Sequence, residues 1–140
     1  MSRTFQVRTT QDRNLIISDF MDKVKNFIPL NKVTIKVFHD GKLVNTDEFD
    51  KVSLNQGLTC FKIDDDYIFV NFKYLNGNLW WIESRALCGI GRSFFVAATS
   101  ALANLTDGLA SSGDGAWHNC EQYHGSELWS EYLSTELDSY

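Results

Sequence analysis

Alternating hydrophobic and polar positions predict a small antiparallel sheet. Residues 33–38 are rich in β-branched side chains and end at His39-Asp40-Gly41, where an Asp-Gly pair supplies the positive φ of a tight hairpin turn. Residues 4–9 alternate as a short strand does. Further strands are expected at residues 58–63, 67–75 and 79–84, with a turn at Asn76-Gly77-Asn78. The pattern therefore predicts a meander in which one sheet face takes helices and the other stays partly open.

Three segments have helical periodicity. Between residues 10 and 28, apolar side chains recur at steps of three and four residues, and Pro29 ends the helix. A strongly apolar helix is expected at residues 93–105, with Gly108 at the position of a left-handed C-terminal cap. A last helix is expected at residues 126–137, with Ser126 as its N-cap. The side chains expected to point inward from this last helix are Leu128, Trp129, Tyr132 and Leu133.

The predicted fold class is α+β. With 140 residues and 44% hydrophobic side chains, the chain has enough apolar material for one core and too little length for two ordinary ones. We expect a single domain over residues 1–140, an antiparallel β-sheet meander of about 4–5 strands packed with two to three helices.

Length, hydropathy and cysteine usage predict a cytoplasmic protein. There is no run of 18 apolar residues, and the N-terminus lacks the apolar core of a signal peptide. Cys60, Cys88 and Cys120 are odd in number and widely spaced, which fits reduced thiols better than a disulfide framework.

Charge is distributed unevenly along the chain. Residues 1–43 hold eight bases against four acids, whereas residues 44–140 hold five against fourteen, within a net charge of −5. From Ser93 to Tyr140 there is no Lys or Arg, although seven carboxylates occur there. An acidic body without a basic stripe argues against direct nucleic-acid binding, because phosphates require Lys and Arg. The one-signed stretch favours a basic protein partner.

Candidate chemistry is sparse. Asp114, His118, Cys120, Glu121 and His124 lie within eleven residues, but their spacing fits no paired-ligand zinc pattern, and ordinary polar loop residues are the stronger interpretation. We expect no catalytic residue, no metal and no cofactor.

Three further motifs have a structural and a functional interpretation. The run Gly89-Ile90-Gly91-Arg92 before a helix is compatible with an anion cradle, although a turn that brings the helix close to the sheet is favoured. Asp64-Asp65-Asp66 is expected to be a solvated turn or an acidic contact for a partner. Trp80 and Trp81 should point to opposite faces of their strand, one into the core.

The segment from Phe94 to Trp117 consists of an Ala-rich helix ending in L-T-x-G, a short apolar step, and then S-x-D-G-A-W. The pattern covers about a sixth of the chain, at Leu105, Thr106, Gly108, Leu109, Ser112, Asp114, Gly115, Ala116 and Trp117. In this pattern the segment resembles small bacterial immunity proteins that neutralise polymorphic or contact-dependent toxins. The resemblance implies a cytoplasmic α+β protein that binds one toxin domain, commonly a nuclease, and blocks its active site or substrate path.

Charge and resemblance together predict an immunity protein for contact-dependent growth inhibition, which binds a basic cognate toxin through an acidic surface. The expected partner is protein, with neither nucleic acid nor membrane bound directly. The alternatives are a small ligand-binding or enzymatic domain, with a pocket lined by Trp80 or Trp81, Tyr67 and His118, and a phage or secretion accessory protein. The expected partner-binding residues are Asp107, Asp114, Trp117, Glu121, Glu127, Glu131, Asp64, Asp65 and Asp66.

Overall fold

The fold combines one large antiparallel sheet with helices. This computed structural model describes residues 3–10, 13–31, 33–64, 66–74, 78–85, 89–112 and 122–139. The helical elements are α1 (Ile17–Val24), a 3₁₀ helix η1 (Thr46–Lys51), α2 (Gly89–Thr106) and α3 (Gly125–Ser139). The strands are β1 (Arg3–Thr9), β2 (Ile35–His39), β3 (Lys42–Val44), β4 (Leu58–Ile63), β5 (Asp66–Tyr74), β6 (Asn78–Ser84), β7 (Leu109–Ser112) and β8 (Gln122–Tyr123).

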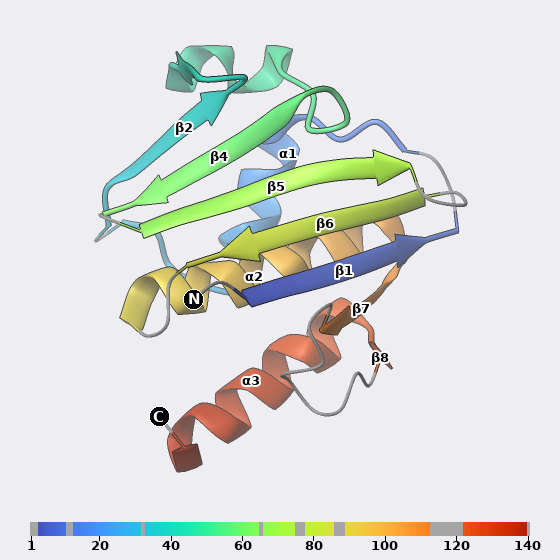
Figure 1. The fold of residues 1–140 in the computed structure, drawn as a ribbon. Helices are drawn as coiled ribbons and strands as arrows, with labels where there is room; N and C mark the ends of the chain where they lie inside the picture. The colour runs from blue at the N-terminus through green and yellow to red at the C-terminus, as the bar shows by residue number, and fades with distance from the viewer. Residues whose placement is uncertain are drawn as a thin grey trace.

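The α+β class is confirmed, and the sheet is larger than predicted. Within the described ranges, eight strands pair in the order β3-β2-β4-β5-β6-β1-β7-β8, against the four or five expected. The central strands β4, β5 and β6 form the expected meander. The N-terminal strand β1 lies between β6 and β7, so strands from both ends of the chain complete the sheet (Figure 1).

Helices α1 and α2 pack against one face of the sheet (Figure 1). Aromatic side chains connect the two layers. The ring centroid of Phe61 in β4 lies 5.4 Å from that of Phe20 in α1 and 5.6 Å from that of Phe94 in α2. Phe5 of β1 lies 5.0 Å from Phe95 in the same way. The core therefore sits between the sheet and these two helices.

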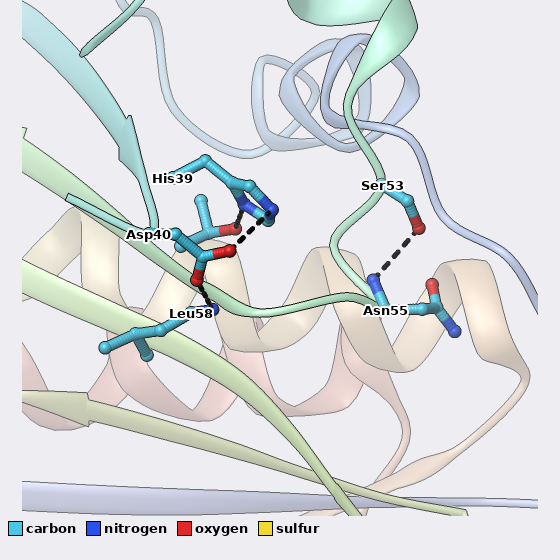
Figure 2. Close-up of polar contacts among 6 residues, drawn as sticks. His39, Asp40, Ser53, Asn55 and Leu58 are labelled. Atoms are coloured by element: carbon cyan, nitrogen blue, oxygen red, sulfur yellow. Dashed lines mark hydrogen bonds and ion pairs between the residues drawn. The ribbon is translucent and has the colours of Figure 1, made fainter. Parts of the chain in front are cut away.

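Helix α1 is much shorter than the predicted helix at residues 10–28. Residues 13–16 are not helical, because residues 52–55 bind their backbone: Leu15 N donates to Asn55 Oδ1 at 2.7 Å, and Leu54 N donates to Leu15 O at 2.7 Å. Asn55 is itself held by Ser53, whose Oγ accepts from Asn55 N at 3.1 Å (Figure 2). Tertiary hydrogen bonds thus replace the helical ones that the periodicity predicts.

The prediction for the end of α2 was wrong by one residue. Asp107, with φ of 50°, adopts the left-handed conformation that we expected of Gly108. Gly108 N donates to Ala103 O at 2.9 Å and Asp107 N to Asn104 O at 3.4 Å, the paired bonds of a Schellman motif. Gly108 instead permits a close approach to β1, because a Cβ there would lie 2.8 Å from the Arg8 carbonyl oxygen.

The hairpin turn is confirmed, and the last helix is confirmed in part. Asp40 and Gly41 have φ of 50° and 82°, as a two-residue hairpin between β2 and β3 requires. Helix α3 begins at Gly125, one residue earlier than predicted. The Glu127 side chain closes its first turn, accepting from His124 N at 3.0 Å, so Ser126 is not the N-cap.

The inward face of α3 was predicted correctly except at one position. Leu128 and Tyr132 are buried, and Trp129 is half-buried against Phe27 at a ring-centroid distance of 5.9 Å. Leu133 is 48% exposed, which contradicts its expected place in the core. A step of five residues from Leu128 turns the helix well away from the inner face.

No helix in the described part of the chain is long and apolar enough to cross a membrane.

Candidate protein-interaction surfaces

The first candidate is the acidic surface of α3. Glu127 and Glu131 lie one helical turn apart beside a shallow hollow of about 390 Å³. We call this hollow the α3 acidic surface. Its lining residues are Tyr123, Ser126, Glu127, Ser130 and Glu131. Glu127 is exposed, although one of its oxygens accepts the His124 backbone bond. The surface therefore presents carboxylates and hydroxyls on a helix that contains no base.

Asp107, a predicted partner-binding residue, follows the half of α2 against which α3 begins. Asp107 is exposed and follows the last turn of α2. Gly125, the first residue of α3, packs against the Ser100 carbonyl oxygen and the Asn104 side chain in that C-terminal half of α2. The start of α3 therefore lies beside the half of α2 that Asp107 follows.

The acidic turn between β4 and β5 belongs to the other end of α2. Asp64 has φ of 53°, and its backbone N donates to Thr34 O at 3.0 Å, so it shapes a turn. The Asp66 carboxylate packs directly against Gly91 in the first turn of α2. Since 18 helical residues rise by about 27 Å, Asp66 and Asp107 cannot belong to one compact patch.

Several predicted residues lie outside the described ranges. They are Asp65, Asn76 and Gly77 of the predicted turn, Cys88, Asp114, Gly115, Ala116, Trp117, His118, Cys120 and Glu121. Among the residues that are described, no group of three or more His, Cys, Asp or Glu side chains is placed to hold a metal ion.

The anion-cradle interpretation of Gly89-Ile90-Gly91-Arg92 fails on geometry. A Cβ on Gly91 would collide with the Asp66 carboxylate, so an acidic side chain of the protein already lies beside this helix N-terminus. A carboxylate there supplies the negative charge that the helix dipole favours and repels an incoming phosphate. The glycine permits the close approach of helix and strand, which was the favoured structural interpretation.

A His-Asp-Thr cluster lies at the β2–β3 hairpin (Figure 2). His39 Nδ1 is 2.9 Å from Thr59 Oγ1, and His39 Nε2 is 3.8 Å from Asp40 Oδ2. The grouping looks like a nucleophile with its base, but Thr59 is fully buried and cannot meet a substrate. Asp40 also accepts from Leu58 N at 2.9 Å. The hydrogen bonds of His39 and Asp40 therefore connect the β2–β3 hairpin to β4.

The residues expected to line a ligand pocket are placed only in part, because His118 lies outside the described ranges. Trp80 is buried in the core on the helix-covered face, as one tryptophan was predicted to be. Strand alternation places Trp81 on the opposite face, together with Tyr67. A different hollow, of about 410 Å³, lies between α1, β2 and η1. Its lining residues are Ser18, Met21, Asp22, Lys25, Leu30, Val33, Ile35, Thr46 and Phe49.

Sequence reasoning missed the apolar character of the sheet face opposite the helices. Leu43, Leu58 and Tyr67 are 54%, 42% and 41% exposed and all belong to that face. The available signal was in β5, where Tyr67 and Phe69 alternate with the buried Ile68 and Val70. When a strand is apolar on both faces, either both faces are covered within the protein or one face is available to bind a partner.

Comparison with known proteins finds no matching family model, and neither a curated protein nor a solved structure matches the chain.

Proposed function

We propose that this protein is an immunity protein that binds and neutralises a cognate bacterial toxin domain, a basic nuclease, through its α3 acidic surface. The observation that carries the proposal is the pairing of Glu127 with Glu131 on a helix without bases, in a stretch that has neither Lys nor Arg from Ser93 onward. The resemblance of residues 94–117 to toxin immunity proteins supports the same class.

The spacing of these carboxylates has a physical cost in the free protein. Like charges at i and i+4 on a helix destabilise it by about 0.2–0.5 kcal/mol. A basic partner would reverse the sign of that interaction, since each carboxylate would then face a Lys or Arg. The Tyr123 side chain, half-buried at the rim of the hollow, adds an aromatic contact of the kind enriched at interfaces.

Neutralisation by binding needs no catalytic group. A nuclease holds phosphates with a basic surface, and a rigid acidic helix face can occupy that surface in place of the nucleic acid. Complementary charge also raises the association rate at low salt, which suits an inhibitor that must act before its target.

The test is co-expression with the toxin reading frame from the same locus. Glu127→Lys/Glu131→Lys should abolish protection of growth and raise the dissociation constant roughly tenfold or more, about 1.4 kcal/mol. The matched control is Asp47→Lys/Asp50→Lys, a double reversal at exposed positions of η1. Binding unaffected by the α3 reversal, or equally weakened by both, would contradict the proposal.

A second candidate function is small-molecule binding in the hollow between α1, β2 and η1. Its volume of about 410 Å³ and its mixed lining of polar and apolar side chains, with Met21, Ile35 and Phe49 among the apolar ones, favour this class. A ligand screen by melting temperature tests it, because a ligand that prefers the folded state must raise that temperature. The effect should be lost on Phe49→Ser and kept on the α3 reversal.

A further inference from the structure

The side chains of β1 to β6 that point away from α1 and α2 form a surface that we call the open face. Its centre is a cross-strand row set by the pairing register. The row consists of Leu43, Phe38, Cys60, Phe69 and Glu83. Tyr67 lies two residues from Phe69 on one side, and its ring stacks on that of Phe69 at a centroid distance of 6.3 Å. Leu58 and Trp81 lie on the other side of the row.

The open face is unusually apolar for a surface in contact with water. Of the four large hydrophobic residues that are exposed in the described ranges, Leu43, Leu58 and Tyr67 belong to it. Phe38, Phe69 and Trp81 are half-buried between them. Contiguous exposed apolar area of this kind marks an interaction site more often than chance, and in the described part of the chain no helix covers it (Figure 1).

The charges on the open face are opposite in sign to those of the chain as a whole. Among side chains that the structure describes, Arg8, Lys36 and Lys62 lie on this face against the single acid Glu83. Lys36 and Lys62 are paired across β2 and β4, and Lys62 Nζ lies 5.5 Å above the Tyr67 ring. Bases are thus interleaved with the exposed apolar side chains, in a protein with net charge −5.

This charge pattern identifies the occupant. Two copies packed face to face would bring their Lys36 and Lys62 pairs into one desolvated interface, which like charges oppose. A nucleic acid would meet the strong negative charge of the rest of the molecule. A polypeptide with apolar and acidic side chains satisfies both the apolar row and the lysines.

We propose that the open face docks an acidic amphipathic helix of a partner protein, at a site separate from the α3 acidic surface. A helix is the element that commonly covers the free face of a sheet. Five neighbouring strands, from β3 to β6 in sheet order, span about 20 Å, which a helix of about 14 residues covers. The protein then has two docking surfaces of opposite charge.

The experiment uses two synthetic helical peptides of 16 residues with the same leucine stripe, one flanked by Glu and the other by Lys. Titration into the full-length protein is followed by amide chemical shifts. The Glu peptide should bind and shift residues of β2, β4 and β5, with affinity falling as salt is raised, while the Lys peptide should not bind. Lys36→Glu/Lys62→Glu should exchange the two preferences, weakening the Glu peptide about tenfold.

Leu43→Ser/Leu58→Ser should also weaken the Glu peptide about tenfold. Leu133→Ser is the matched control, since Leu133 is the remaining exposed large hydrophobic among the described residues and lies on α3. All these positions are exposed, so circular dichroism should confirm folding of each variant. The proposal would be overturned if both peptides bind equally or if neither binds. It would also be overturned by concentration-dependent sedimentation of the protein that Leu43→Ser/Leu58→Ser abolishes, because that result would show a second copy as the occupant. None of these results depends on toxin binding at α3.

Discussion

The Tyr132 hydroxyl of α3 lies 2.9 Å from Ser93 Oγ of α2, a hydrogen bond between the two helices. Tyr132 is 1% exposed, so in the folded protein its hydroxyl hydrogen-bonds to Ser93 instead of to water. The bond fixes how α3, and with it the α3 acidic surface, is oriented on α2.

Tyr132→Phe should lower the free energy of unfolding by about 1 kcal/mol, because the hydrogen bond is lost while the ring still packs. Urea denaturation measures this change. The neighbouring substitution Leu133→Ala, at an exposed position, should change the same quantity by less than about 0.5 kcal/mol. A larger effect at Leu133 than at Tyr132 would show that the inner and outer faces of α3 have been assigned wrongly.

Gly125→Ala should destabilise the protein by about 1–3 kcal/mol. A Cβ at this position would collide with the Ser100 carbonyl oxygen, a backbone atom that cannot move without disturbing α2. The helix propensity gained from alanine, at most about 1 kcal/mol, is smaller. Thermal unfolding compared with Ser126→Ala, at the exposed next position, checks the prediction. A variant as stable as the wild type would place α3 further from α2.

Gly91→Ala should be destabilising in the wild type and less so in an Asp66→Ala background. The added Cβ would collide with the Asp66 carboxylate, and removing that carboxylate relieves the closest of these contacts. A double-mutant cycle should give a coupling of about 0.5 kcal/mol or more. Additive effects would mean that Asp66 does not lie against the first turn of α2.

Burial raises the pKa of the Cys60 thiol above its ordinary value of 9.0. In a Cys88→Ser/Cys120→Ser background, alkylation of Cys60 at pH 8 should therefore be slower than that of a cysteine peptide, since the thiolate is the reactive form. The folded state binds this proton more tightly than the unfolded state does. The contribution of Cys60 to stability is thus fully present below pH 9 and is lost as pH rises through the folded-state pKa. Comparison of urea unfolding with Cys60→Ser at pH 8 and pH 10 checks the sign.

Periodicity predicted the elements whose own side chains determine them. Helix α2 is apolar on nearly every side and is recognisable as a buried helix, and Asp40-Gly41 specifies its hairpin through two positive φ values. Residues 13–16 have the same helical spacing as α1, yet the loop at residues 52–55 binds their backbone. A local sequence pattern cannot reveal that a residue about forty positions away hydrogen-bonds to this backbone in place of the helix.

Strand β7 was missed for a related reason. Its sequence, Leu-Ala-Ser-Ser, lacks the β-branched and aromatic residues that mark strands, and its place in the sheet depends on pairing with β1, a hundred residues earlier. A partly open sheet face was predicted, but its apolar character was missed, because alternation shows which residues share a face and cannot show which of the two faces a helix covers. At residues 67–70 of β5 both faces are apolar, and the chain topology determines which one is covered.

Strand β1 pairs with β6 on one side and with β7 on the other. During synthesis β1 therefore has no sheet neighbour until residues 78–84 emerge, and its second edge stays unpaired until residues 109–112 emerge. Such distant pairing slows folding and leaves a strand with two unpaired edges for much of translation. Nascent chains arrested before residue 112 should accordingly engage chaperones through β1, and release from the chaperone should coincide with the appearance of β7.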